Sequence, residues 1–75
     1  MAEIKEFLET FKKSGKTWTE LGSVLDCNPK YYRQSAYNIL HGRRFASLDT
    51  LIKMGAVIGI DEIDVFKIWR SRQNT

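Results

Sequence analysis

The chain has 75 residues, a formal net charge of +3 and a hydrophobic fraction of 43%. This length allows one small domain, and the apolar content is high enough for a packed core rather than a disordered chain. A single cysteine excludes an intramolecular disulfide, and the lack of an apolar run of about 20 residues excludes a membrane-spanning helix. Charged residues interrupt the N-terminal segment, so we expect no signal peptide and a cytoplasmic protein.

The first two predicted helices lie on either side of a Ser-Gly break. The first spans about residues 2–13, has apolar residues spaced by three and four, and ends at Gly15. The second begins at Thr17, because Thr17 followed three residues later by Glu20 forms a capping box. We expect this helix to end near Leu25.

The third predicted helix opens at Asn28-Pro29. Asparagine is a strong N-cap, and proline at the first helical position loses no N–H that the helix needs. Gly42 ends this segment. The residues predicted to face inward are Tyr32, Ala36, Ile39 and Leu40.

The last two predicted helices begin at cap residues, Ser47 and Asp61. The fourth ends at Gly59, and its predicted inward residues are Leu48, Leu51, Ile52, Gly55 and Ile58. We assign residues 1–71 to the domain and 72–75 to a frayed tail. No segment has the period-two alternation of a strand, so we predict an all-α fold, a compact bundle of about five helices.

The segment from Asn28 to Leu48 carries four basic side chains and no carboxylate, although the whole chain is only +3. A one-sided basic helix on a nearly neutral small domain is typical of nucleic-acid binding. The alternative is a solvated helix face with no partner. The lack of carboxylates and the aromatic and amide residues between the cations favour nucleic acid.

The polar side chains of the third helix recur at helical spacing, opposite its inward stripe. Arginine can donate two parallel hydrogen bonds to guanine, and glutamine can pair with adenine in the same way. We therefore predict base contacts from this face: Arg33, Gln34, Tyr37, Lys30 and Asn38. Contacts with the DNA backbone are expected from residues beside the face or beyond its end: Tyr31, His41, Arg43 and Arg44.

Gly22 lies inside the second predicted helix, where glycine costs about 1 kcal/mol relative to alanine. Close approach of the next helix would explain its presence. The alternative is a neutral weak point in a short helix.

Two segments resemble the helix-turn-helix of Cro and phage-repressor-like (XRE-type) DNA-binding domains. The segment from Thr17 to Gly22 resembles the opening of that motif. The segment from Ile39 to Leu51 is similar to the family's recognition-helix end, where Gly and basic residues precede a Ser-Leu-x-Thr-Leu helix start. The resemblance covers about residues 4–66 and ends at Ile58-Gly59-Ile60.

This resemblance implies a lambda-repressor-like fold and a sequence-specific regulator of transcription that binds double-stranded DNA. A repressor of phage or prophage type is the expected form. The family's phosphate contacts at the start of the second helix imply the same role for Thr17, Trp18 and Thr19. Trp18 stands at a position that is commonly glutamine in the family. Its indole N–H could donate to a phosphate, and the alternative is that the indole is buried in the core.

One departure concerns the segment between Leu21 and Gly42, which is about four residues longer than in the family. The extra residues either lengthen the turn, which moves the start of the third helix towards Tyr31, or add a turn to that helix. The Asn28-Pro29 cap favours the longer helix.

Other kinds of site find little support. His41 and Cys27 are the only residues of their types, which does not make a metal site or a nucleophile–base pair. We expect no enzymatic activity, metal, cofactor or small-molecule ligand.

The fifth helix is the candidate interface of a homodimer, through Phe66 and Trp69. The alternative, which we favour, is that both rings seal the core against the first helix. Two other functions stay open for the whole chain. It could be a protein-binding adaptor that reuses the fold, or an accessory protein in DNA architecture or recombination.

Overall fold

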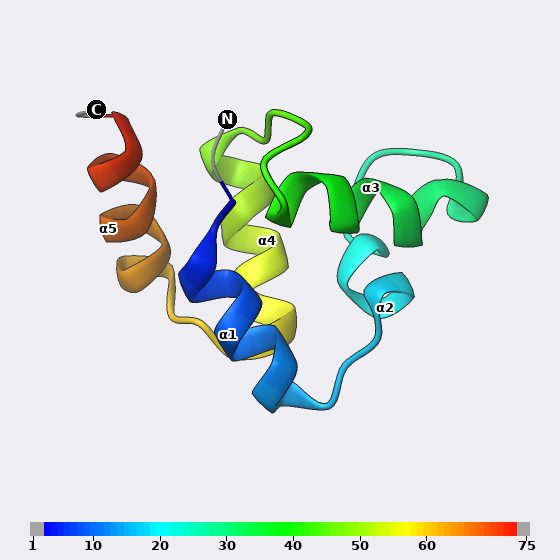
Figure 1. The fold of residues 1–75 in the computed structure, drawn as a ribbon, viewed down its shortest axis with the longest axis horizontal. Helices are drawn as coiled ribbons and strands as arrows, with labels where there is room; N and C mark the ends of the chain where they lie inside the picture. Colours follow the sequence, from blue (N-terminus) through cyan, green and yellow to red (C-terminus); the bar gives the residue numbers. More distant parts are fainter. Residues whose placement is uncertain (1–2, 74–75) are drawn as a thin grey trace.

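The computed structural model describes residues 3–73, which form five α-helices, one 3-10 turn and no strand (Figure 1). The elements are α1 (Lys5–Ser14), α2 (Trp18–Gly22), the 3-10 turn η1 (Pro29–Tyr31), α3 (Tyr32–Leu40), α4 (Leu48–Ile58) and α5 (Glu62–Gln73). The predicted all-α bundle of about five helices is therefore confirmed. Among the described helices, none combines the length and the apolar character needed to cross a membrane.

Most helix ends lie where the capping residues predicted them. Gly15 and Gly59 adopt left-handed conformations, with φ of 74° and 87°, and close α1 and α4. Thr17 forms the complete capping box with Glu20, and the Ser47 hydroxyl accepts from the Thr50 N–H. Helix α1 begins at Lys5 rather than near residue 2, which lies outside the described residues.

Helix α2 ends three residues earlier than predicted. Beyond Gly22, the amides of Ser23 and Leu25 donate to carbonyls three residues back, Glu20 and Gly22, so the chain tightens and leaves the α-helical pattern. Val24 and Leu25 still pack against the core from this turn. The prediction that these two side chains contact the core is confirmed, but the predicted helix end near Leu25 is wrong.

The extra residues between α2 and α3 lie in the connection, so the favoured longer helix is wrong. The Asn28 side chain does cap Pro29 and accepts from the Lys30 N–H, but it starts a 3-10 turn. Tyr31 then has φ −104° and ψ 0°, outside the α-helical range, and α3 begins only at Tyr32. The predicted N-cap at Asn28 is therefore confirmed, but the turn that follows it is a 3-10 turn and not the predicted first turn of an α-helix.

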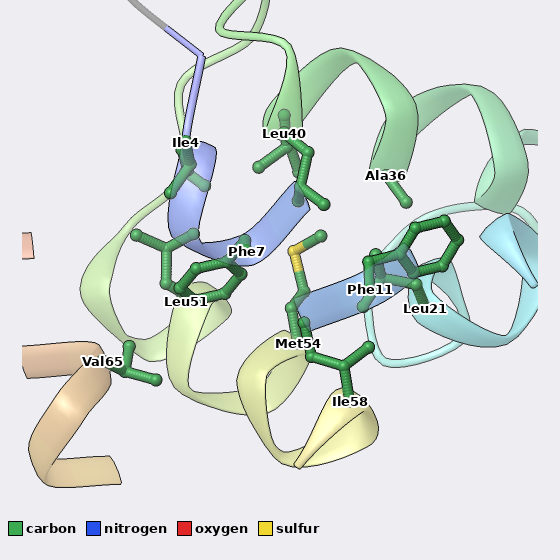
Figure 2. Packing of buried hydrophobic residues seen from close by; sticks show 12 residues of the cluster. Ile4, Phe7, Phe11, Leu21, Ala36, Leu40, Leu51, Met54, Ile58 and Val65 are labelled. Carbon is green, nitrogen blue, oxygen red and sulfur yellow. The ribbon is translucent and has the colours of Figure 1, made fainter. Parts of the chain in front are cut away.

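The core is a cluster of apolar side chains from all five helices and the segment before α1 (Figure 2). Ile4, Phe7, Leu21 and Leu40 are fully buried within it. The amide of Ile4 donates to the Leu40 carbonyl at 2.8 Å, which joins the start of the chain to the end of α3.

Helix α4 supplies the centre of this core, because it contacts α1, α2 and α5. Met54 of α4 is fully buried, although the predicted inward stripe did not include it. A helix with neighbours on several sides buries a wider face than one apolar stripe describes.

Helix α5 continues through Gln73, past the predicted start of the tail at Arg72. The Arg72 guanidinium donates to the Glu3 carbonyl at 3.2 Å and so ties this end of α5 to the segment before α1. Residues 74–75 of the predicted tail lie outside the described part of the chain.

Candidate nucleic-acid interface

The backbones of α2 and α3 come into close contact at Gly22. A Cβ atom at this position would overlap the backbone of Tyr32, including its carbonyl oxygen. The close approach predicted from this glycine is therefore present, and the contact orients α3 across α2.

One side of η1 and α3 is polar, and the opposite side is packed into the core. The buried side presents Ser35, Ala36, Ile39 and Leu40. The outer side, which we call the polar face, carries Lys30, Arg33, Gln34, Tyr37, Asn38 and His41. Lys30, Arg33, Gln34 and Tyr37 are exposed, and Asn38 and His41 are half-buried. The predicted base-contacting residues therefore lie together on the outside of the molecule.

The cations of the polar face are not neutralised by neighbouring acids. Within the described part of the chain, no carboxylate forms an ion pair with Lys30 or Arg33, nor with the nearby Arg43, whereas Lys16 pairs with Glu20 at 3.9 Å. The positive potential of the face is thus available to an external anion.

Trp18 lies in an aromatic cluster that joins the polar face to α1 and α2. Its ring centroid is 4.2 Å from that of Phe11 and 5.3 Å from that of Tyr37, and the His41 ring lies 4.1 Å from that of Tyr37. The indole is half-buried: it packs partly against the core and also lines a surface groove, so its burial is incomplete. Phe11 was not predicted as part of the site, because its spacing in α1 indicates only that it is buried.

The start of α2 and the polar face border the same groove, which has a volume of about 510 Å³. It is lined by Phe11, Lys16, Thr17, Trp18, Thr19 and Arg33. Thr19 is exposed, while the Thr17 hydroxyl already accepts from the Glu20 amide at 3.1 Å. The two segments predicted to contact phosphate and bases are therefore adjacent in the fold.

The neighbouring Arg43 and Arg44 point to different sides of α3. Their amides both donate to the Asn38 carbonyl, at 2.8 and 3.3 Å, so the chain turns sharply after the helix. The Arg43 guanidinium then lies over the Tyr37 ring, 5.8 Å from its centroid, at the edge of the polar face. Arg44 instead donates to the hydroxyl of the buried Ser35 at 3.0 Å.

The remaining predicted residue of this surface, Tyr31, is exposed beside Lys30. The Lys30 ammonium lies 5.1 Å from the centroid of the Tyr31 ring. Both precede the first turn of α3, so their positions depend on the 3-10 turn.

On α5, the two predicted interface residues differ in burial. Phe66 is 44% exposed, whereas Trp69 packs partly against the core. Val65, one position earlier, is fully buried, so the helix turns Phe66 outward. The favoured alternative, that both rings seal the core, is wrong for Phe66. Ile63 is 63% exposed on the same helix and was not predicted as part of an interface.

Among the described residues, no group of three His, Cys, Asp or Glu side chains is arranged to hold a metal ion. Comparisons with family models, curated proteins and solved structures found no match to this chain, so residues and geometry carry the functional argument.

Proposed function

We propose that this protein is a regulator of transcription that binds double-stranded DNA in a sequence-specific manner, with α3 in the major groove. The observation that carries the proposal is the polar face of α3, which is exposed, basic and free of ion pairs with described carboxylates. A helix of this character fits the width of the major groove and its negative potential.

Arg33 and Gln34 are the proposed base readers, because both are exposed on the first turns of α3. Arginine favours guanine and glutamine favours adenine, since each can form two hydrogen bonds with that base edge. Lys30, Tyr37 and Asn38 flank these two residues and would contact the neighbouring bases.

The proposed backbone contacts lie on both sides of the reading residues. Thr17, Trp18 and Thr19 line the same groove as Arg33. His41 and Arg43 lie at the other end of α3, where Tyr37 supports the Arg43 guanidinium. Phosphate contacts at two places would set the register of α3 on the duplex.

The proposed setting is a small repressor of phage or prophage type, which would act on DNA in the cytosol. Half-sites one helical turn apart would require a homodimer, since one recognition helix reads only a few base pairs.

Selection of bound duplexes from a random pool tests this function, followed by titration of the selected and a scrambled duplex with salt. We expect a recurrent sequence, tighter binding to it than to the scrambled duplex, and affinity for both that falls steeply as salt rises.

The absence of binding to any duplex at low salt would contradict the proposal. Binding without a recurrent sequence, together with a bend in the bound DNA, would instead favour an architectural role. A protein-binding adaptor would bind no DNA and would use the same basic face for an acidic partner.

A further inference from the structure

His41 is the only histidine of the chain, and histidine is the side chain that ordinarily changes charge between pH 5 and 8. It is the C-cap residue of α3 and lies at the end of the polar face. Its ring centroid is 4.1 Å from that of Tyr37 and 6.1 Å from that of Trp18. These two rings fix the imidazole beside the proposed phosphate contacts.

The ring nitrogens of His41 are open to an external acceptor. Among the described residues, the ring has aromatic neighbours but no hydrogen-bond partner. No buried side-chain nitrogen or oxygen in this part of the chain lacks a hydrogen bond, so the unbonded ring nitrogens are in contact with solvent. A neutral imidazole offers one N–H donor, whereas an imidazolium offers two donors and a positive charge.

The charged and titratable groups around His41 come from three directions. On α3 and the loop after it these are the Tyr37 phenol and the Arg43 guanidinium, which lies 5.8 Å from the Tyr37 ring centroid. From α2, the neighbour is the uncharged Trp18. Across a groove of about 440 Å³, two carboxylates and two ammonium groups lie opposite the imidazole: Glu3, Glu9, Lys5 and Lys12. On the side of the polar face, the neighbouring charge is therefore the positive Arg43, and a bound phosphate would bring an anion to that side.

We infer that binding of DNA by this protein takes up a proton on His41, so that the affinity for DNA rises as the pH falls. This coupling rests on the proposed function, because the phosphate that favours the charged imidazole belongs to the bound duplex. The carbonyl end of a helix repels an anion, so a phosphate beside the end of α3 needs cationic donors nearby. Arg43 supplies such a donor at every pH, and His41 supplies a second one only when it is protonated.

The direction of the effect follows from the proton balance of binding. A hydrogen bond from imidazolium to phosphate is stronger than one from neutral imidazole, so the complex binds more protons than the free protein does. Lower pH then shifts the equilibrium towards the complex. Replacement of one neutral hydrogen bond by a charge-assisted one corresponds to an affinity about three- to tenfold higher at pH 5.5 than at pH 7.5.

Two measurements on the full chain test this coupling, both with a duplex that the protein selects. Fluorescence anisotropy at constant ionic strength gives the affinity from pH 5.5 to pH 7.5, and the wild type should show the rise towards acid pH. Isothermal titration calorimetry at pH 6.5, in two buffers with different ionisation enthalpies, counts the protons taken up on binding. The wild type should take up a fraction of one proton per chain, and this readout requires no variant.

Variants of His41 separate its charge from its place in the fold. His41→Gln cannot be protonated, so its affinity should be nearly constant over this pH range and close to that of the wild type at pH 7.5. His41→Arg is charged throughout, so its affinity should also be constant, and its salt dependence should be steeper by about one phosphate contact. Glu9→Gln is the matched control, because it removes a carboxylate across the groove and should leave the pH dependence unchanged. Circular dichroism at both pH values checks that each variant is folded.

A wild-type protein that binds its selected duplex equally well at pH 5.5 and pH 7.5, with no proton taken up, would overturn the coupling and leave the proposed function intact. A pH dependence that persists in folded His41→Gln would show that another group takes up the proton. Failure to bind any duplex at either pH would contradict the proposed function, and the coupling with it.

Discussion

At the scale of residues, the structure separates side chains that are adjacent in the sequence. Arg43 and Arg44 share an acceptor for their amides, the Asn38 carbonyl, yet their guanidinium groups reach opposite sides of α3. Because the chain turns sharply after α3, the side chains of these two consecutive residues point in different directions. Backbone contacts are predicted from both arginines, and of the two only Arg43 lies at the edge of the polar face.

Arg33 and Arg43 should differ in how their loss affects DNA binding. Arg33→Ala is expected to cost about 1–3 kcal/mol on the selected site and to relax preference at one base position. Arg43→Ala should weaken all duplexes alike, because phosphate carries no sequence information. Fluorescence anisotropy with the selected site, its single-base variants and a scrambled duplex measures both effects. Equal loss on specific and scrambled DNA from both variants would show that Arg33 does not read a base.

Arg44 should act on stability more than on DNA binding. Arg44→Ala removes the hydrogen bond to Ser35, a loss of about 1 kcal/mol in the free energy of unfolding for a partly exposed pair. Urea denaturation measures this loss. The salt dependence of DNA affinity should stay at the wild-type slope in Arg44→Ala, whereas in Arg43→Ala the slope should fall by about one. A reduced salt dependence of DNA affinity in Arg44→Ala would show that Arg44 does contact phosphate.

At the scale of elements, helix starts and stops follow from local capping, but the crossing of α2 and α3 depends on one contact between distant residues. Gly22 and Tyr32 are ten positions apart and their backbones touch. The absence of a side chain at Gly22 permits this contact, and the nine-residue connection from Ser23 to Tyr31 spans the distance around it.

Gly22→Ala is therefore expected to destabilise the fold. Alanine gains about 1 kcal/mol in helix propensity, but its methyl group would overlap a backbone carbonyl, which cannot rotate away as a side chain can. Overpacking of this kind costs about 1–3 kcal/mol, and the backbone neighbour places it at the upper end, for a net loss of about 1–2 kcal/mol.

Thermal unfolding followed by circular dichroism measures the effect of Gly22→Ala. Thr19→Ala is the matched control, because it adds an alanine to an exposed position of the same helix and should leave the melting temperature almost unchanged. A stabilised Gly22→Ala variant would mean that α2 and α3 do not approach as closely as described.

At the scale of the whole molecule, five short helices depend on one shared core. None of them is longer than 12 residues, so each is marginal in isolation and is stabilised by burial of its apolar side. Phe7 is completely buried where the core residues of α1 and α4 meet (Figure 2). Loss of such a side chain is expected to affect all the helices together.

Phe7→Ala should cost about 3–5 kcal/mol in the free energy of unfolding. Domains have about 0.05–0.15 kcal/mol of stability per residue, which limits a chain of this length to about 4–11 kcal/mol. The loss therefore takes up from about a quarter to all of the stability, and Phe7→Ala should have a clearly lower urea midpoint than the wild type at 25 °C. Urea denaturation monitored by circular dichroism checks this. Phe45→Ala is the matched control, since Phe45 is 71% exposed and its loss should change the stability by less than about 0.5 kcal/mol. Similar midpoints for the two variants would place Phe7 outside the core.

Features that depend only on residues close together in the chain could be predicted from the sequence. The Thr17–Glu20 capping box, the Ser47 cap and the glycines that end α1 and α4 involve near neighbours, whose geometry is the same in any fold. The spacing of apolar residues also identified the buried side of α3, and hence its polar face, because helical periodicity ties burial to position.

Features that depend on contacts between separate helices could be identified only from the folded structure. These include the clustering of Phe11 and Trp18 with Tyr37 and the outward position of Phe66. In each case a periodic pattern allowed two environments for the same side chain. The choice between them depends on which neighbouring helix occupies the adjacent space, and this information is not present within a single segment.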